Sequence, residues 1–212
     1  MTKPYPDIFK ELTPAKAWVL GLWYSDGCVS KSKAAWTSAL SSNDLDVILK
    51  ARSIIQDTSQ PDRVKLLKFK REHRVSVYSV DFAHHLMTRG VMPRKSKTML
   101  WPTWLTPELL PYFVRGLWDG DGSISLPGRY PYLQLTYTSG SEDFLEGMVW
   151  AISPVIGGLE PTIAWTGTSW QFHIYTTRAA KLLEWLYEGA NARIRGDRKY
   201  AIYQKWLGVG KE

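Results

Sequence analysis

The sequence predicts an α+β fold made of two similar halves, each with the element order αββαββα. The first observation is a repeat: residues 18–27 read WVLGLWYSDG, and residues 113–122 read FVRGLWDGDG. The second is that the same succession of strand-like and helix-like patterns follows each repeat. Self-similarity over this length favours two pseudo-symmetric half-domains, which we place at residues 1–100 and 101–212 and join along the repeated element.

Each repeated stretch is predicted to be a helix. The first helix begins at residues 13–14, where Thr-Pro supplies a hydroxyl N-cap and a proline at the first helical position. It ends at residues 26–27, where Asp-Gly offers a glycine suited to a left-handed cap. The second copy is predicted to run in the same way, from Thr-Pro at 106–107 to Asp-Gly at 121–122.

A glycine lies inside each predicted helix, Gly21 in the first and Gly116 in the second. Glycine in a helix interior costs about 1 kcal/mol relative to alanine. The same cost at the same place in both copies suggests that the two backbones touch there. We therefore expect the two helices to pack on each other and to bring their C-terminal ends together.

The first sheet strands are predicted around residues 34–41 and 131–139, where side chains alternate with the strand period. The predicted core face carries Trp36, Ser38, Leu40, Leu135, Tyr137 and Ser139. The opposite face carries Ala35, Thr37, Ala39, Gln134, Thr136 and Thr138, among which Thr37, Gln134 and Thr136 are candidates to contact base edges or phosphates. Ser42 and Ser141 are predicted to cap the helices that follow.

A hairpin is predicted next in each half, at 63–80 and at 162–177. Polar side chains on the outer face of the second hairpin can contact base edges or phosphates, whereas the first hairpin supplies cations. These candidates are Gln171, His173 and Tyr175 in the second hairpin, and Lys65, Lys68, Lys70, Arg71 and Arg74 in the first. The alternative for each residue is a solvated outer sheet face.

Each half closes with a helix, at 81–89 and 178–187, and then a basic tract. The tracts read PRKSK at 93–97 and GDRKY at 196–200, and a last helix is predicted at about 199–207. The link between the halves, residues 98–105, is short, which favours one rigid unit.

The chain carries a net charge of +7, and this charge is uneven. Residues 1–105 have 17 Lys and Arg against 9 Asp and Glu, whereas residues 106–212 have 10 against 11. Excess base predicts a polyanionic partner, because Lys and Arg neutralise phosphates and release counterions. The asymmetry adds the hypothesis that the first half binds phosphates more tightly. Charge alone is equally compatible with a basic protein that binds no polyanion.

Cys28 is the single cysteine, so no internal disulfide is expected, and a reducing compartment is indicated. No apolar run approaches a membrane span, and no signal-peptide pattern opens the chain. We therefore expect a soluble intracellular protein, in the cytoplasm or an organelle matrix, that does not bind membranes.

Residues 19–27 and 114–122, with the αββαββα order around them, resemble the LAGLIDADG homing endonucleases in their single-chain form with two motifs. The runs GVMPRKS at 90–96 and DRKY at 197–200 resemble the same family. The resemblance covers nearly the whole chain. Two motifs, each with a matching basic tract, are a far more specific signal than one.

The resemblance implies a monomer in which the motif helices form the interface between the halves. It implies that Asp26 and Asp121 bind divalent metal, Mg²⁺ with Mn²⁺ as a substitute, whereas Ca²⁺ binds without supporting cleavage. The two antiparallel sheets would form a saddle over a long, asymmetric DNA duplex. Such enzymes cut both strands across the minor groove and leave 3′ overhangs. Family lysines that assist this chemistry correspond to Lys95 and Lys199.

One position departs from the motif: Tyr24 stands where the second copy keeps an acid, Asp119. The family does not usually assign metal to this position. The departure therefore does not argue against activity, but it weakens a catalytic role for Asp119.

Phosphodiester hydrolysis explains why these residue types are needed. Two nearby carboxylates can hold Mg²⁺, which activates water and stabilises the leaving oxygen. Mg²⁺ prefers oxygen ligands and keeps several waters, so few carboxylates suffice. The carbonyls of Ser25 and Gly120, unpaired at helix C-termini, are candidate further ligands. The alternatives are helix-ending Asp-Gly turns for the acids and simple phosphate binding for the lysines.

Two other functions use the same basic saddle. One is an RNA maturase that assists intron folding, and the other is a DNA-binding regulator that does not cut. A regulator would have little use for both metal-binding acids, and both are present. We therefore predict a site-specific endonuclease acting on double-stranded DNA.

Overall fold

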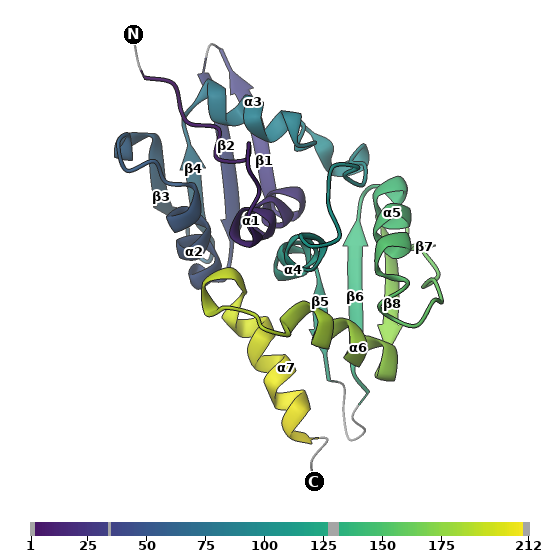
Figure 1. Ribbon diagram of the computed structural model, residues 1–212. Coiled ribbons are helices and arrows are strands. Elements are labelled where there is room, and N and C mark those ends of the chain that lie inside the picture. The colour runs from purple at the N-terminus through teal and green to yellow at the C-terminus, as the bar shows by residue number, and fades with distance from the viewer. Residues whose placement is uncertain (1–2, 34, 127–131, 210–212) are drawn as a thin grey trace.

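The computed structural model describes residues 3–33, 35–126 and 132–209 (Figure 1). The first part of the chain forms α1 (Pro14–Ser25), β1 (Gly27–Ser32), β2 (Ala35–Ser42), α2 (Leu45–Ile55), β3 (Val64–Lys68), β4 (His73–Val77) and α3 (Val80–Thr88). The second part forms α4 (Leu110–Gly120), β5 (Ser123–Ser125), β6 (Gln134–Ser139), α5 (Glu142–Ile152), β7 (Ala164–Trp165), β8 (Trp170–Tyr175), α6 (Thr176–Tyr187) and α7 (Asp197–Val209). The α+β class and the αββαββα order are confirmed.

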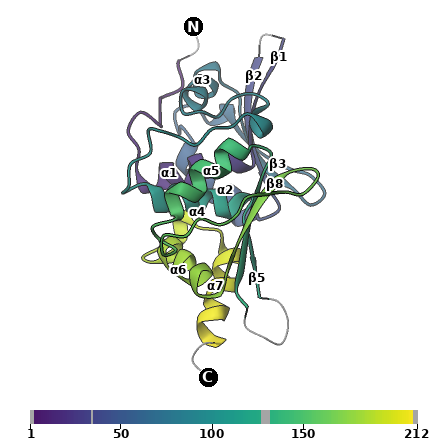
Figure 2. The ribbon, with the colours of Figure 1, turned by 90° about the vertical axis from the view of Figure 1, so that its right-hand side faces the viewer.

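The strands form two four-stranded antiparallel sheets with the same topology, β1-β2-β4-β3 and β5-β6-β8-β7. Figure 2 shows the helices on one side of the sheets, so the outer faces of both sheets point the same way. The division into half-domains at residue 100 remains a prediction.

The predicted core faces are largely confirmed. Leu135 and Tyr137 of β6 are buried opposite Ile174 and Phe172 of β8, which is the period-two pattern of a half-buried strand. In the first sheet Ser38 and Leu40 are buried likewise, while Trp36 is only partly buried. Ala39 faces the other way, as predicted, and is nevertheless buried.

Helices α1 and α4 cross in backbone contact at the two predicted glycines. A Cβ atom on Gly21 would collide with the carbonyl oxygen of Phe113 in α4, and one on Gly116 would collide with the carbonyl oxygen of Trp18 in α1. The expectation that the motif helices pack through these glycines is confirmed. Every residue of α1 from Ala17 to Tyr24 is buried, so this helix pair is the centre of the molecule.

The predicted helix ends are partly wrong. Thr13 caps α1 as expected, its hydroxyl accepting from the amide of Lys16 at 3.4 Å. Residues 26–27 do not form a left-handed cap, because Asp26 is right-handed and Gly27 begins β1 without a positive φ. Glycine is required there instead because a Cβ would collide with Trp23, and Gly122 stands in the same relation to Trp118.

Two predicted caps also differ from the structure. Helix α4 begins at Leu110 rather than at residues 106–107, because the carbonyl of Thr106 accepts from the amides of Leu109 and Leu110 in a separate turn. Ser141 caps α5 as predicted, whereas Asp44 takes the N-cap position of α2. The hydroxyl of Ser42 accepts from the amide of Asp44 instead.

Within the described ranges, no helix has both the length and the apolar character needed to cross a membrane.

Replacing Gly21 with alanine should lower the free energy of unfolding by at least about 2 kcal/mol, because the new methyl group forces two packed backbones apart. Gly208→Ala in α7 is the matched control, since a Cβ there meets nothing within 4 Å. Urea unfolding followed by tryptophan fluorescence would measure both. Equal stability of the two variants would contradict backbone contact at Gly21.

Candidate active site and nucleic-acid interface

The two predicted metal-binding acids lie at the C-caps of the crossed helices, Asp26 after α1 and Asp121 after α4. The packing of α1 on α4 brings these ends together, as expected. A Cβ on Gly120 would lie 3.1 Å from a carboxylate oxygen of Asp26. Asp26 directly precedes β1, and Asp121 is separated from β5 only by Gly122, so both lie where the helices meet the sheets.

Each acid shares a hollow with the residue that precedes the other acid. A hollow of 300 Å³ is lined by Asp26 and Gly120, and one of 230 Å³ by Asp121 and Ser25. The four predicted metal-site residues are therefore brought together in pairs, and each pair combines the two halves of the chain.

The charge of the acid pair is incompletely compensated. Asp26 reaches solvent, but the protein crowded around its carboxyl group and the nearby charge of Asp121 raise its pKa to about 7. Burial also raises the pKa of Asp121, although Lys95 and Lys199 act to lower it. Carboxylates with raised pKa values at a surface hollow are typical of sites that bind a cation or a proton.

Lys95 and Lys199 are buried, and each reaches the carbonyl end of one motif helix. The Lys95 ammonium donates to the carbonyls of Tyr24 at 2.5 Å and Ser25 at 3.1 Å. The Lys199 ammonium donates to three carbonyls of the other helix, those of Trp118 at 2.5 Å, Asp119 at 2.9 Å and Gly120 at 2.8 Å. A cation is stabilised here, because the last carbonyls of a helix lack partners and carry partial negative charge.

Burial lowers the pKa of both lysines, that of Lys199 to about 8. Asp121 and Asp26 counteract part of the shift of Lys95, and Asp119 and Asp26 part of the shift of Lys199. Two carboxylates and two ammonium groups thus lie around one junction, each shifted toward its neutral form by burial.

The donor atoms at this junction fit a hard divalent cation. Among the described residues no group of three or more His, Cys, Asp or Glu side chains could hold a metal ion by itself. The acid pair instead offers carboxylate oxygens with main-chain carbonyls beside them. Mg²⁺ accepts such a partial set, because it keeps several waters and takes phosphate oxygens from a substrate.

The outer face of the first sheet carries only some of the predicted cations. Strand register places Thr37, Lys65 and Arg74 on this face, whereas Lys68 alternates to the helix side opposite His73. Lys70 and Arg71 lie in the exposed loop between β3 and β4. Arg74 is already engaged, because it donates at 2.8 Å both to the hydroxyl of Ser41 and to the carboxylate of Glu72.

The outer face of the second sheet carries a connected polar patch. The Nδ1 atom of His173 lies 2.9 Å from the Thr136 hydroxyl and 3.2 Å from the Gln134 amide, and its ring stacks on Tyr175. Gln171 lies opposite Thr138 on the same face. All five predicted residues of this sheet therefore share one face.

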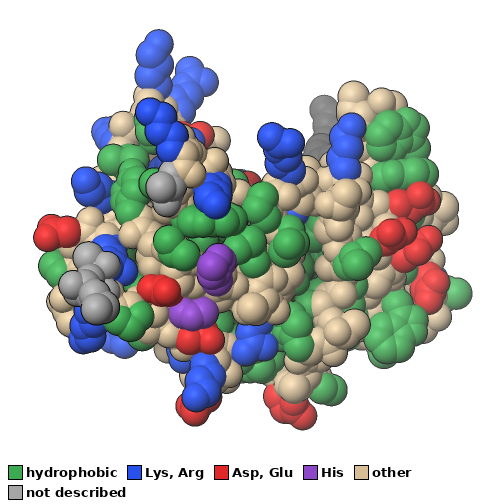
Figure 3. Space-filling view, turned by 90° about the horizontal axis from the view of Figure 1, so that it is seen from above, with side chains coloured by type: hydrophobic (Ala, Val, Ile, Leu, Met, Phe, Trp, Pro, Cys, Tyr) green, Lys and Arg blue, Asp and Glu red, His purple; other side chains and the backbone are tan. Residues whose placement is uncertain are grey.

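Figure 3 shows most of the basic side chains in view over the first half, several of them on its raised part at the top, with a depression between the halves. Acidic side chains gather at the far end of the second half. This distribution agrees with the charge asymmetry of the sequence.

Several contacts at the junction have no signal in the sequence. Trp18 donates to Asp119 at 2.8 Å from a position 101 residues away, and Arg198 pairs with Asp44 of the first half at 2.9 Å. No periodicity or spacing marks such pairs. The only local signal was the Arg-Lys repeat, which located the tracts but not their contacts.

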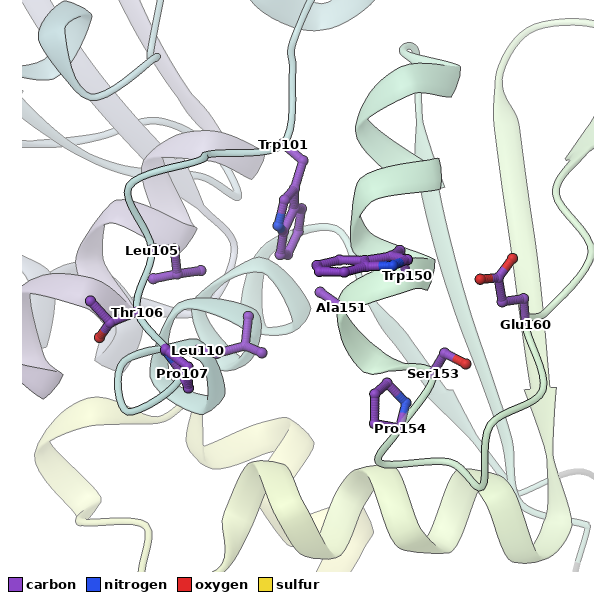
Figure 4. Close-up of a pocket in the computed structure, with 10 residues that line it drawn as sticks. All are labelled: Trp101, Leu105, Thr106, Pro107, Leu110, Trp150, Ala151, Ser153, Pro154 and Glu160. Carbon is purple, nitrogen blue, oxygen red and sulfur yellow. The ribbon is translucent and has the colours of Figure 1, made fainter.

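A hollow of 480 Å³ lies away from the acids, between the link and α5, where Trp101 faces Trp150 (Figure 4). Its lining is mainly apolar, and Glu160 is its one charged residue. It contains none of the residues that converge at the helix ends, so we place the chemistry at the acid pair.

The raised pKa of Asp26 predicts that the folding stability of the metal-free protein, measured in the presence of a chelator, depends on pH. Its carboxyl group ionises at 3.8 in the unfolded chain and near 7 in the folded protein, so folding stability falls as the pH rises between these values. Asp26→Asn removes this loss. Because the group reaches solvent, we expect a gain of only about 1 kcal/mol, or about 2–4 °C in Tm, at pH 8.

Scanning calorimetry at pH 8 and pH 4 would check this, with Asp121→Asn expected to act in the same direction. If Asp26→Asn changed Tm equally at both pH values, the link between the raised pKa of Asp26 and folding stability would be contradicted.

Comparison with known proteins agrees with this geometry. Residues 108–150 match the family model of the LAGLIDADG-like domain. No curated protein sequence matches the chain. Among solved structures, mesophilic variants of the homing endonuclease I-DmoI are similar, with 14% identity and a TM-score of 0.61 over 81% of this chain and 87% of theirs.

Two other homing endonucleases cover more of the chain. I-GzeII in complex with its DNA target has 12% identity and a TM-score of 0.61 over 95% of this chain and 90% of its own. I-SmaMI bound to cleaved DNA has 12% identity and a TM-score of 0.57 over 94% of this chain and 89% of its own. The chain therefore contains a LAGLIDADG-like domain and has the fold of the single-chain, two-domain LAGLIDADG homing endonucleases.

Proposed function

We propose that this protein is a site-specific endonuclease that makes a metal-dependent double-strand break in a long, asymmetric DNA target and leaves 3′ overhangs. The observation that carries the proposal is the pairing of Asp26 with Gly120 and of Asp121 with Ser25 in two hollows at the helix–sheet junction. Two such hollows suit two scissile phosphates, one in each strand. Complexes of I-DmoI with DNA and Ca, and with DNA and Mn, support a divalent metal in this fold.

The residues of the site would have different roles in cleavage. Asp26 and Asp121 would hold the cations. The carbonyls of Ser25 and Gly120, which are not unpaired as predicted but accept from Lys95 and Lys199, would be further oxygen ligands through their second lone pairs. A divalent cation there would supply Lewis-acid chemistry and lower the pKa of a bound water. Lys95 and Lys199 keep positive charge beside the phosphates, where it favours the charge that develops in the transition state. Because one chain supplies both halves, a monomer is sufficient.

The sheets would position the duplex. The outer faces of both sheets point to the same side, and cations of the first sheet bind phosphates without reading sequence. The polar patch of the second sheet, with Gln134, Gln171 and His173, presents donors and acceptors suited to base edges. This division predicts that the first half contributes more to affinity and the second more to base readout.

Asp26→Asn and Asp121→Asn should each reduce double-strand cleavage by about a thousandfold or more, because the loss of a metal ligand removes several kcal/mol of transition-state stabilisation. Binding of the target should change little. Asp143→Asn, which alters an exposed acid on α5, is the control and should cut normally. Full activity in either active-site variant would refute the assignment.

The target is first obtained by selection from a random duplex library in Ca²⁺, followed by transfer to Mg²⁺ and sequencing of the ends. Defined breaks with 3′ extensions would support the proposal. A selected duplex that stays intact in Mg²⁺ would favour a regulator that does not cut. Failure to enrich any duplex would favour RNA and the maturase function.

A further inference from the structure

Tyr24 and Asp119 occupy the same position in the two motifs, two residues before each acid, and both side chains are buried. The sequence offers no reason for a tyrosine in one copy and an aspartate in the other. In the structure each side chain contacts the main chain at the start of a basic tract or a few residues before it. The Tyr24 hydroxyl donates to the carbonyl of Arg89 at 2.5 Å, and the Asp119 carboxylate accepts from the amide of Gly196 at 2.8 Å.

The lysine of each tract then returns to the main chain of the same motif residue. Lys95, six residues after Arg89, donates to the carbonyl of Tyr24. Lys199, three residues after Gly196, donates to the carbonyl of Asp119. In each half a closed loop therefore runs from a motif side chain, through the tract, and back to the motif backbone.

The surroundings show that these side chains are fixed. The carboxylate oxygen of Asp119 that accepts from Gly196 also accepts from the indole of Trp18 at 2.8 Å. In the first half, Gly90 follows Arg89 and has a φ of +95°, and a Cβ there would collide with the Tyr24 hydroxyl. The carbonyl of Arg89 also accepts from Trp104 at 3.2 Å. The main chain is thus anchored within the core four residues before the first tract and at the first residue of the second.

We infer that Tyr24 and Asp119 are equivalent positioning residues, each of which anchors the basic tract of its half so that one buried lysine reaches the end of one motif helix. The two do this with opposite hydrogen-bond polarity, the tyrosine as donor and the aspartate as acceptor. The departure from the motif at Tyr24 then preserves the anchoring function. For the proposed cleavage reaction, each residue acts on one strand through its own lysine.

Lysine reactivity in the metal-free, full-length protein tests the anchoring without reference to cleavage. Limiting acetic anhydride and peptide mass spectrometry would compare Lys95 and Lys199 with exposed Lys205 as the internal reference. We expect Tyr24→Phe to increase acetylation of Lys95 about fivefold, the factor that one net hydrogen bond contributes, and to leave Lys199 unchanged. Asp119→Leu should do the reverse.

Asp119→Asn is the conservative control. It loses the same charge as Asp119→Leu, but its amide oxygen can still accept from both Gly196 and Trp18, so Lys199 should be acetylated less than in Asp119→Leu. Increased acetylation of both lysines in each variant, or unchanged acetylation of Lys95 in Tyr24→Phe, would overturn the inference. Tyr24→Phe removes only a hydroxyl group, so it provides the test even if Asp119→Leu fails to fold.

A second measurement uses cleavage and therefore rests on the proposed function. On the selected target, Tyr24→Phe should slow cutting of one strand and Asp119→Leu cutting of the other, so nicks accumulate in opposite strands. Equal slowing of both strands in each variant would indicate a general structural defect and overturn the inference. If the unsubstituted protein does not cut, the proposed function fails, while the acetylation result still decides the anchoring.

Discussion

The contact between the backbones of α1 and α4 is the constraint on which the rest of the structure depends. Gly21 and Gly116 let each helix reach main-chain atoms of the other, so the separation of the helices is set by backbone rather than by adaptable side chains. Both acids follow immediately at the helix ends. This backbone contact, which cannot adapt as side chains can, therefore fixes the distance between the acids. It preorganises a pair of like charges that repel each other.

The electrostatics of the junction follow from that closeness. Two carboxylates at adjacent helix C-termini face partial negative charge from carbonyls that lack helical partners. Lys95 and Lys199 bind to those carbonyls, and they offset the field without forming an ion pair with either acid. The carboxylates thus remain available, and burial together with the nearby charge of Asp121 still raises the pKa of Asp26 to about 7. A bound cation would compensate the charge of the acid pair.

Much of this arrangement was predictable from the sequence, because it repeats. The two copies identified the paired helices, the glycine contact, the acids and the alternating faces of β6 and β8. Local capping rules succeeded at Thr13 and Ser141, where a hydroxyl faces free amides. They failed at residues 106–107, because a turn that precedes α4 uses the same Thr-Pro signal.

The partners of the buried polar groups were not predictable. The contacts of Lys95 with Ser25 and of Lys199 with Gly120 join residues 70 and 79 positions apart within one half, and Trp18 reaches Asp119 across the interface. Such pairings depend on tertiary packing within and between the halves, which no local pattern encodes. The face of Lys68 was also mistaken, because residues near a strand end were grouped by charge rather than by alternation.

The last segment of each half makes contacts with the other half. Lys50 of α2 forms an ion pair with Asp197 at 2.8 Å and donates to the carbonyl of Arg195 at 2.9 Å, so the segment that leads into α7 lies against the first half. In the opposite direction, Ser141 donates to the carbonyl of Met99 at 2.6 Å. Chimeras that exchange one half with a relative would therefore have to transplant these crossing contacts along with the helix interface. A half of this architecture can therefore be exchanged as an independent unit only up to its basic tract, not up to the link between the halves.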